Sequence, residues 1–300
     1  MENVSVQDIV RATGGVLLSG NSDALLNKIR LDSRQVEAGD LFVPIIGEKV
    51  DAHRFLPQVA ENGAGAVLTS EQNAKTEEME KTSCAWIAVD DTKKALQAVG
   101  RYLRKRLTLP IVGVTGSVGK TTTREMIAAA LSARYHVYNP PGNSNSQVGV
   151  PITVSEITKA DEVGVLELGM SEPGELTVIA QIAKPDIAVI TNIGITHIEQ
   201  LGSRENIYKE KMTIQDGLSD GGVLVLNGDD DMLQKTKGKD GVKTVYYGTG
   251  ENCDYRAVDL VLTDGKAEFT ALHGGKTQKI RLNVMGMHNV MNAMAAIAVC

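Results

Sequence analysis

The sequence is poor in cysteine and in aromatic residues, and it contains no long apolar run. Its three cysteines, Cys84, Cys253 and Cys300, have neither the spacing of a metal site nor that of a disulfide framework, which favours a reducing compartment. No stretch approaches the roughly 18 apolar residues of a membrane span, and the N-terminus has no basic segment followed by an apolar one. We therefore expect a cytoplasmic protein without a membrane span.

An excess of positive charge is also missing. The formal net charge is −6, which argues against a large nucleic-acid-binding surface. A chain of 300 residues, 42% of them hydrophobic, is long enough for about two domains of ~150 residues. An acidic chain that binds anionic phosphates must do so locally, with backbone N–H groups, a lysine and a bound cation.

A glycine-rich turn at residues 109–126 joins a short apolar run to a helical pattern. Gly116 and Gly119 allow backbone N–H groups to converge on phosphate oxygens, and the N-terminal end of the following helix adds positive potential. Lys120 is placed to reach the β- and γ-phosphates, and the Thr121 hydroxyl is placed to bind Mg²⁺. The stretch therefore predicts a phosphate-binding loop.

The match to the generic phosphate loop is incomplete, because Val114 stands where the first glycine is expected and only the shorter G-x-x-G-K-T-T is present. The alternative is a glycine-rich turn that binds nothing, but the order strand, Gly-Lys-Thr, helix favours phosphate binding. A kinase or a GTPase would share the loop. The sequence contains neither a guanine-specifying Asn-Lys-x-Asp motif nor a lid arginine cluster.

Residues 1–107 predict a small α/β domain in which no catalytic constellation is visible. Asp32-Ser33-Arg34 by itself is typical of a turn with a surface arginine. A helix over residues 92–107 carries basic residues outside its apolar face, which favours a solvated surface. The other expected elements are a helix over 4–13, a strand over 16–18, a helix over 53–62, and strands over 64–69 and 85–89.

From residue 108 onward strands and helices alternate, which predicts a parallel sheet with helices on both faces. The fold class is therefore α/β: a small α/β N-terminal domain, residues 1–107, and a P-loop, mostly parallel-sheet central domain, residues 108–300. The pattern becomes alternating after residue 255 and predicts a β-meander. An apolar helix follows over 290–299, and the sequence stops inside it. We therefore expect the protein to continue into a further domain.

Two side chains at strand ends are candidates for metal binding, because ligands of open parallel sheets bind at the carboxyl ends of strands. Glu167 lies in an apolar strand over 163–168, where a carboxylate is costly unless it is paired, protonated or bound to a metal. Metal ligation, directly or through water, is the favoured interpretation. His197 follows a strand over 186–193, where a histidine is as readily a hydrogen-bonded structural residue as a ligand. The acidic residues 229–231 favour a solvated turn.

Four segments together resemble a known family. Residues 113–122 (GVTGSVGKTT), 167–169 (ELG), 192–199 (NIGITHIE) and 286–293 (GMHNVMNA) are similar, in order and spacing, to the Mur ligases of bacterial cell-wall synthesis. The resemblance covers essentially the whole chain, and its motifs are specific in combination. It also links Asp32-Ser33-Arg34 to the uridine end of the substrate, in place of a simple surface turn. Segments 141–145, 148–151 and 201–203 resemble most the branch that adds D-alanyl-D-alanine.

The resemblance implies a three-domain ligase, of which this chain holds the N-terminal UDP-sugar domain and the central ATP-binding domain. The implied reaction uses ATP to join D-alanyl-D-alanine to UDP-MurNAc-tripeptide through an acyl phosphate, a step of peptidoglycan synthesis and hence of cell shape and division. Positioning and charge neutralisation at the phosphates then dominate catalysis. Because the amine-binding C-terminal domain is absent, we expect this chain alone to be inactive. We also expect a monomer.

The resemblance implies a role for each candidate site residue. Lys120, Lys211 and His197 are implied as catalytic. ATP is implied to contact Gly116, Ser117, Val118, Gly119, Lys120, Thr121 and Thr122 through its phosphates and Asn289 through adenine. Mg²⁺ is implied at Thr121, Glu167, His197 and Lys211, the last as a carbamate. Ser33 and Arg34 are implied to hold the uridine diphosphate, and Asn143 and Asn145 to line the path of the muramoyl peptide.

The carbamate on Lys211 rests on the alignment of residues 210–214 with a lysine that carries CO₂ in several Mur ligases. A lysine desolvated beside other cations has a lowered pKa, so its neutral amine can add CO₂. Lys209 points about 200° away around the same helix. The alternative for Lys211 is an ordinary exposed lysine on an amphipathic helix.

Two departures from the family pattern lie in the first domain: Asp51-Ala52-His53 replaces the usual Asp-Gly-His, and Pro44 interrupts a strand that usually ends in Ala-Leu. They leave the uridine contacts open and do not affect the ATP site. Other functions also stay open. A different Mur ligase or a folylpolyglutamate synthase would share the ATP site and differ in acceptor, and a non-catalytic nucleotide-binding module is the third alternative.

Overall fold

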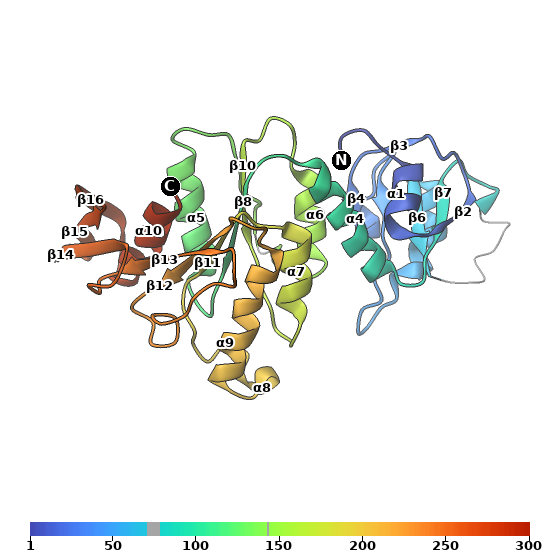
Figure 1. Ribbon diagram of the computed structural model, residues 1–300. Coiled ribbons are helices and arrows are strands. Elements are labelled where there is room, and N and C mark those ends of the chain that lie inside the picture. The colour runs from blue at the N-terminus through green and yellow to red at the C-terminus, as the bar shows by residue number, and fades with distance from the viewer. Residues whose placement is uncertain (71–78, 143) are drawn as a thin grey trace. The chain divides into compact units, whose positions relative to one another are not determined.

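The structure is a computed structural model that describes residues 1–70, 79–142 and 144–300 (Figure 1). The chain divides into two compact units. Unit 1 comprises Met1–Leu107 with Pro151–Thr158, and unit 2 comprises Thr108–Val150 with Lys159–Cys300. Pro151–Thr158 was not foreseen as part of the first unit. The predicted roles of the two domains in binding UDP-sugar and ATP stay predictions.

Unit 1 is built on a five-stranded sheet in the order β2-β7-β6-β5-β4, which is parallel except for β2. A separate antiparallel pair joins β1 (Val4–Ser5) to β3 (Leu25–Leu26). The sheet strands are β2 (Val16–Ser19), β4 (Ile29–Arg30), β5 (Leu41–Phe42), β6 (Ala66–Thr69) and β7 (Ala85–Ala88). The helices are α1 (Val6–Thr13), α2 (Leu56–Glu61) and α4 (Thr92–Arg106).

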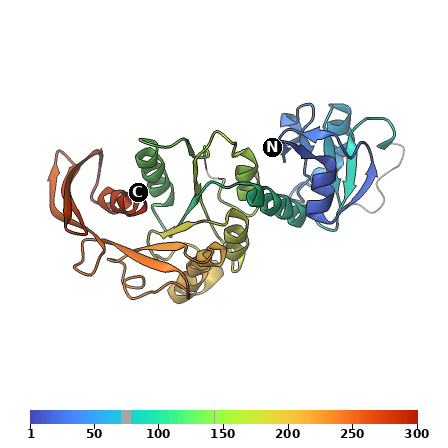
Figure 2. The same ribbon diagram turned by 45° about the horizontal axis from the view of Figure 1, so that its top comes forward.

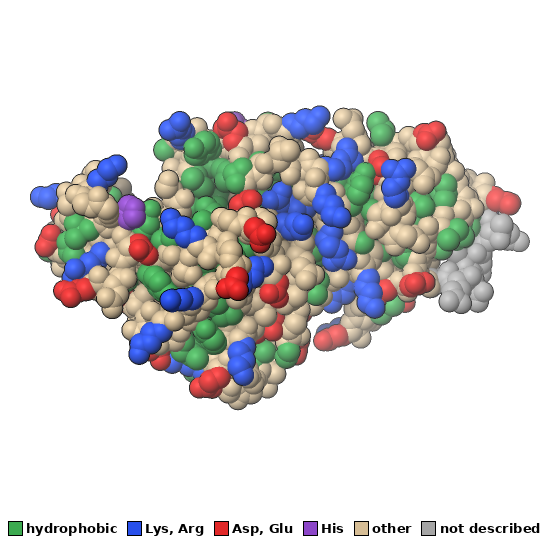
Figure 3. Space-filling view, in the orientation of Figure 1, with side chains coloured by type: hydrophobic (Ala, Val, Ile, Leu, Met, Phe, Trp, Pro, Cys, Tyr) green, Lys and Arg blue, Asp and Glu red, His purple; other side chains and the backbone are tan. Residues whose placement is uncertain are grey.

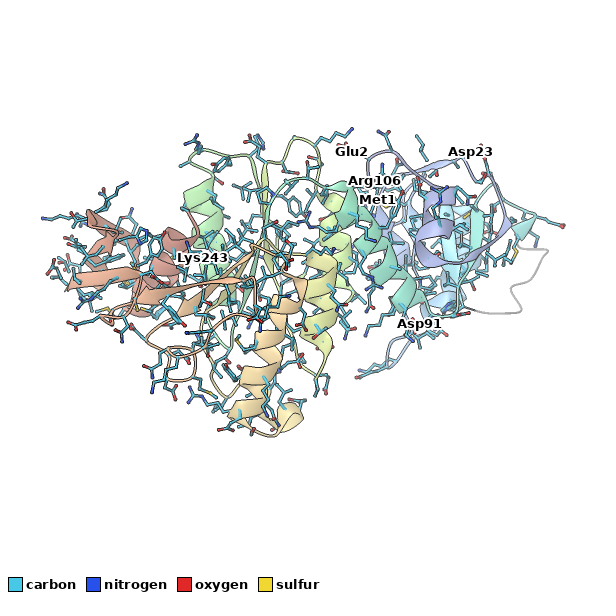
Figure 4. All side chains as sticks on the ribbon, viewed as in Figure 1. Met1, Glu2, Asp23, Asp91, Arg106 and Lys243 are labelled. Carbon is cyan, nitrogen blue, oxygen red and sulfur yellow. The ribbon has the colours of Figure 1, made fainter. Side chains whose placement is uncertain are left out.

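Local sequence sets the limits of these helices. Ser5 and Asp8 form a capping box at the start of α1, and Gly14 ends the helix in the left-handed conformation, φ 67°. The Asp91 carboxylate accepts from the backbone N–H of Lys94 and caps α4. At the other end of α4, Arg106 donates to the backbone oxygens of the N-terminal segment, beside the labelled Met1 and Glu2 (Figure 4).

The basic residues of α4 were predicted to form a solvated face. Lys93, Lys94, Lys105 and Arg106 are exposed, and the space-filling view shows lysine and arginine side chains over this helix (Figure 3). Arg104 is the exception, because it is buried and donates to the Leu107 backbone oxygen at 3.1 Å.

Unit 2 contains a nine-stranded sheet in the order β16-β15-β14-β13-β12-β11-β8-β10-β9 (Figures 1 and 2). The strands from β9 to β14 pair in parallel, and β14, β15 and β16 form the predicted antiparallel meander, which continues the same sheet. The strands are β8 (Ile111–Thr115), β9 (Val137–Tyr138), β10 (Val163–Glu167), β11 (Ile187–Ile190), β12 (Val223–Asn227), β13 (Lys243–Gly248), β14 (Tyr255–Thr263), β15 (Lys266–His273) and β16 (Lys276–Met285). The mostly parallel α/β fold is confirmed.

Helices pack on both faces of this sheet. Helices α5 and α10 lie side by side on one face, where Val112 and Val114 of β8 share a core with Ile127 and Met294 (Figures 1 and 2). On the other face, the space above Gly113 is filled by Leu168 and Pro185, next to α7. The helices of unit 2 are α5 (Lys120–Leu131), α7 (Glu175–Ala183), α8 (Ile198–Leu201), α9 (Arg204–Met212) and α10 (His288–Val299), and α6 (Gly149–Glu156) passes from unit 2 into unit 1.

The central strand of the sheet, β8, leads into the glycine-rich turn. Its register places Val114 opposite Glu167 of β10 and Thr115 opposite Ile190 of β11. The two strands that precede the predicted metal ligands therefore flank the phosphate loop, as the sequence predicted. Among the described helices, none combines the length and the apolar character needed to cross a membrane.

We expect Leu96→Ala in α4 to lower the free energy of unfolding of unit 1 by about 2–5 kcal/mol, because the fully buried Leu96 would leave a cavity. Trp86, the single tryptophan, is buried in β7 of the same unit, so its fluorescence during urea unfolding reports on unit 1. The matched control is Lys93→Ala on the exposed side of α4, which should change stability by less than about 0.5 kcal/mol. Equal effects of the two substitutions would contradict the packing described.

Candidate functional site

The phosphate loop begins the helix α5 at Lys120, with Gly119 as its N-cap at φ 81°. The ammonium group of Lys120 folds back over the loop and donates to the backbone oxygens of Gly116 at 3.0 Å and Ser117 at 3.3 Å. Burial lowers the pKa of Lys120, while the nearby Glu167 opposes this shift. The lysine thus lies at the loop where the sequence predicted phosphate to bind.

Gly116 is required by a close contact rather than by flexibility alone. A Cβ atom at this position would lie 1.8 Å from the hydroxyl oxygen of Thr191, which no side chain could accept. That hydroxyl donates to the backbone oxygen of Val118 at 2.7 Å. Gly116 therefore allows Thr191, directly after β11, to pack against the phosphate loop and donate to it.

The side-chain amide of Asn192 hydrogen-bonds to the phosphate loop through both its oxygen and its nitrogen. Its Oδ1 accepts from the backbone N–H of Val118 at 3.0 Å, and its Nδ2 donates to the backbone oxygen of the same residue at 2.9 Å. The backbone oxygen of Asn192 accepts from Ser117 N–H at 3.0 Å, and Gly194 N–H donates to the Ser117 hydroxyl at 2.8 Å. These contacts fix the backbone of residues 117 and 118, and this role of Asn192 was not predicted.

Glu167 is 4% exposed, and each of its carboxylate oxygens has a neutral donor. The Thr121 hydroxyl donates to Oε2 at 2.7 Å, and the Asn145 amide donates to Oε1 at 2.8 Å. Three of the predicted site residues, from α5, β10 and the loop after β9, are therefore in contact. Oxygen groups of this kind are the ligands that Mg²⁺ prefers.

Lys211 is 2% exposed, which excludes the alternative of an ordinary surface lysine. Its ammonium group donates to the Gly116 backbone oxygen at 3.0 Å, so it lies on the same loop as Lys120. Burial, and next the charge of Lys120, lower the pKa of Lys211 from 10.5 to about 7. Lys209, by contrast, is exposed.

His197 lies at the N-cap of α8, where it adopts a left-handed backbone conformation with φ 63°, and its side chain is partly exposed. The segment that leads to it is fixed at Ile193. The backbone N–H of Ile193 donates to Asp230 at 2.9 Å, and its backbone oxygen accepts from Arg204 at 2.8 Å. Arg204 in turn forms a salt bridge with Asp231.

The expectation of a solvated turn at residues 229–231 is confirmed, since these residues form a turn in which Asp229 and Asp231 are exposed. The structure adds that each of the three carboxylates has a partner. Asp229 caps a turn by accepting from the backbone of Thr249 and Gly250, Asp230 caps its own turn and anchors Ile193, and Asp231 pairs with Arg204. The distant partners could not be predicted from the run of acids, because they lie 20 to 37 residues away in the chain.

Asn289, predicted to contact adenine, is buried at the start of α10. Its Nδ2 donates to the Met285 backbone oxygen at 2.8 Å, and its Oδ1 accepts from Asn292 at 2.9 Å. Asn292 also accepts from the Thr123 hydroxyl of α5 at 3.0 Å. The residue is thus next to the helix that carries the loop, and its contact with adenine stays a prediction.

In unit 1, Ser33 and Arg34 line a pocket of about 570 Å³ with Asp32, Val50 and Phe55 among its other walls. Asp32 accepts hydrogen bonds from Arg34, which lower its pKa to about 2. The Arg34 side chain is largely exposed, and its guanidinium pairs with the Asp32 carboxylate. Asn143, the remaining predicted substrate residue, lies outside the described residues.

Within residues 1–70, 79–142 and 144–300, no three histidine, cysteine, aspartate or glutamate side chains gather as a metal cluster. A nucleotide-bound Mg²⁺ takes one or two carboxylates and completes its shell with phosphate oxygens and water. Thr121 and Glu167 are the described groups that fit such an ion. The part of His197 in the site stays a prediction.

Comparison with known proteins defines the class of this fold and site. The family model for the Mur ligase middle domain matches residues 114–300, and the model for the catalytic domain of the Mur ligase family matches residues 26–103. The chain therefore belongs to the Mur ligase family.

Within the family, the chain is similar to ligases of one kind. It is 39% identical to UDP-N-acetylmuramoyl-tripeptide–D-alanyl-D-alanine ligase of Bacillus subtilis (strain 168), over 98% of this chain and 63% of that protein. The crystal structure of MurF from Acinetobacter baumannii has a TM-score of 0.88 and 31% identity, over 98% of this chain and 64% of that one. MurF from Thermotoga maritima in complex with ADP has a TM-score of 0.83 and 28% identity, over 93% and 64%. The chain thus spans about three fifths of the length of its relatives.

The lowered pKa of Lys211 predicts a specific pH dependence of stability. Between pH 7 and 10.5 the folded chain binds fewer protons at Lys211 than the unfolded chain, so the free energy of unfolding rises with pH across this window. Lys211→Met removes this contribution. In CO₂-free buffer with a chelator, we expect the free energy of unfolding of the wild type to rise relative to that of the variant. The rise should be up to about 1.4 kcal/mol per pH unit above pH 7.

Urea unfolding followed by far-UV circular dichroism at pH 7, 8 and 9 measures this difference. Lys209→Met, which removes an exposed lysine from the same helix, should parallel the wild type at every pH. A Lys211→Met difference that stays constant with pH would show that the pKa of Lys211 is not lowered.

Proposed function

We propose that the protein which contains this chain is an ATP-dependent ligase that joins D-alanyl-D-alanine to UDP-MurNAc-tripeptide in peptidoglycan precursor synthesis. The observation that carries the proposal is the convergence of Lys120 and Lys211 on the Gly116 backbone oxygen, next to the Thr121–Glu167 contact. Identity of 31–39% to ligases named for this reaction, over almost the whole chain, supports the same conclusion. The cytoplasmic location and the monomeric state stay predictions.

The proposed reaction has two steps. The free carboxylate of the tripeptide attacks the γ-phosphorus of ATP, the bond to the β-γ bridging oxygen breaks, and ADP leaves from an acyl phosphate. The amine of D-alanyl-D-alanine then attacks the acyl carbon, loses a proton and expels phosphate. The protein supplies little covalent chemistry, so the work of its residues is to position the groups and to stabilise the charge that develops.

The described residues divide this work by position. Backbone N–H groups of the loop from Gly116 to Thr122 would bind the phosphates, and those of Ser117 and Val118 would first have to leave their acceptors on Asn192. The Lys120 ammonium would likewise leave the Gly116 backbone oxygen for the phosphate charge. Asn145 would line the path of the tripeptide, as would Asn143, and Asn289 would contact adenine. The pocket beside Ser33 and Arg34 in unit 1 would hold the uridine diphosphate, since the exposed Arg34 guanidinium suits a diphosphate.

Mg²⁺ fits the site because Glu167 and Thr121 present hard oxygen ligands in a place where the carboxylate is almost fully buried. We assign Thr121 and Glu167 to this ion and place His197 at a second one. When bound, the ion would neutralise phosphate charge and orient the γ-phosphate. Hydrogen bonds from Thr121 and Asn145 orient the Glu167 carboxylate.

We also assign a carbamate to Lys211. Its pKa of about 7 leaves a large fraction of neutral amine near neutral pH. The neutral amine adds to the carbon of CO₂, and one proton leaves the nitrogen, which turns a cation into an anion. This change replaces an ammonium group by a carboxylate-like oxygen ligand suited to Mg²⁺.

Lys120→Ala should lower ligation at least about 100-fold, because one positive charge at the γ-phosphate is lost. The assay measures ADP release that depends on both UDP-MurNAc-tripeptide and D-alanyl-D-alanine, in a chain extended to the length of the matched relatives. Lys209→Ala is the matched control and should retain activity. Near-wild-type turnover of Lys120→Ala would refute the phosphate-loop assignment. ADP release without either acceptor would favour a different ATPase or nucleotide-binding module.

Lys211→Ala should lose most of the ligase activity, and acetate should restore part of it by supplying a small carboxylate at the same place. In the wild type, removal of CO₂ should lower activity and added bicarbonate should restore it. The alanine variant should respond to acetate and not to bicarbonate. Full activity of Lys211→Ala in CO₂-free buffer would exclude the carbamate.

A further inference from the structure

Arg124 lies one helical turn after the phosphate loop and is 2% exposed, although it is charged. Its Nη1 donates to the backbone oxygen of Gly142 at 3.0 Å, and its Nη2 donates to the neighbouring Glu125 carboxylate. The other oxygen of Glu125 accepts from the Asn139 amide at 2.8 Å. Through this Arg124–Glu125 pair, α5 contacts the loop after β9 at two separate points.

A third contact joins the same loop to the phosphate-binding end of α5. Asn145 donates to Glu167, which accepts from Thr121 at its other oxygen. Thr121, Arg124 and Glu125 are spaced i, i+3 and i+4, so they lie on one face of α5. The backbone oxygen of Asn145 also accepts from Gly169 N–H at 2.8 Å, and a Cβ on Gly169 would lie 2.8 Å from Asn145 Cγ. Asn145 is therefore closely fitted to the end of β10.

The composition of this contact does not favour stability. The Arg124 guanidinium must be stripped of water, whereas the side chain of its partner Glu125 is 51% exposed, so solvent weakens the attraction that would offset this cost. Within the part of the chain that the structure describes, the Nε of Arg124 and the Oδ1 of Asn139 are buried without a hydrogen-bond partner. Both facts are expected of a contact that specifies one loop conformation at some cost in stability.

We propose that Arg124 and Glu125 are positioning residues that hold Asn139 and Gly142, in the loop after β9, in one conformation, which the UDP-MurNAc-tripeptide then requires for binding. The identity of that ligand rests on the proposed function. The pair fixes Asn139 and Gly142, while Glu167 fixes Asn145, and so these three residues are held in place before the substrate arrives. A ligand that binds an ordered loop does not lose affinity in ordering it.

The first experiment uses no ligand and measures amide hydrogen exchange. Gly149 and Val150 N–H donate to Ser146, and Gly169 N–H donates to Asn145, so these three amides report on the loop. In Arg124→Leu they should exchange at least tenfold faster than in the wild type. Arg124→Lys, which keeps the charge and can reach Gly142, should restore most of the protection. Arg134→Leu, which removes an exposed arginine just beyond α5, is the matched control and should change nothing. Unchanged exchange in Arg124→Leu would overturn the proposal.

The second experiment measures, by calorimetry, the affinity of the chain for UDP-MurNAc-tripeptide and for Mg·ADP. Arg124→Leu should weaken the affinity for UDP-MurNAc-tripeptide at least tenfold and change the affinity for Mg·ADP less than twofold. An equal loss for both ligands would point to a purely structural role and would overturn the proposal, as would an unchanged affinity for the tripeptide. Asn139→Ala removes only the contact to Glu125 and should give a smaller effect of the same kind, which covers the case in which Arg124→Leu does not fold.

The two experiments separate this inference from the proposed function. If the wild type binds Mg·ADP and no UDP-MurNAc-tripeptide, the function proposed above is wrong and so is the role of the pair in binding that substrate. If the wild type binds both ligands and only the exchange result fails, the function stands and the Arg124–Glu125 pair does not hold the loop.

Discussion

Two ammonium groups, those of Lys120 and Lys211, donate to a single backbone oxygen, that of Gly116. Burial lowers the pKa of both lysines, and the positive charge of Lys120 lowers the pKa of Lys211 further. The arrangement is favourable only if an anion is brought to it or if one of the charges is removed. Phosphate binding does the first, and the neutral amine of Lys211 near pH 7 does the second.

The rest of unit 2 keeps these groups in place. Strand β8 is central in the sheet, and β10 and β11 on its two sides deliver Glu167 and the Thr191–Asn192 pair to the same edge. Thr191 occupies the space that a side chain at Gly116 would need, and Asn192 satisfies both backbone groups of Val118. The loop conformation is thus set by the neighbouring strand as much as by its own glycines.

The local features of the sequence predicted much of this. Periodicity and caps located β8, α5, β10 and the meander, because these depend on neighbours in the chain. Strand β13 was not predicted, because the residues around it in the sequence are polar. Helices α6 and α7 were not predicted either. The partners of Asp230 and Arg124 were not predictable either, since an acid in a turn or an arginine on a helix gives no sign of a contact made far along the chain.

Charge also explains why Glu167 and Lys211 must be considered together. As described, the site has two ammonium groups and one carboxylate near the loop, an excess of one positive charge that attracts a polyphosphate. A carbamate at Lys211 would reverse this to an excess of one negative charge. The site would then repel ATP alone and accept it with Mg²⁺, because the ion supplies the missing positive charge between the carboxylates and the phosphates. On the proposed modification, the charge of this one buried lysine would decide whether the loop selects a bare phosphate or a metal-bound nucleotide.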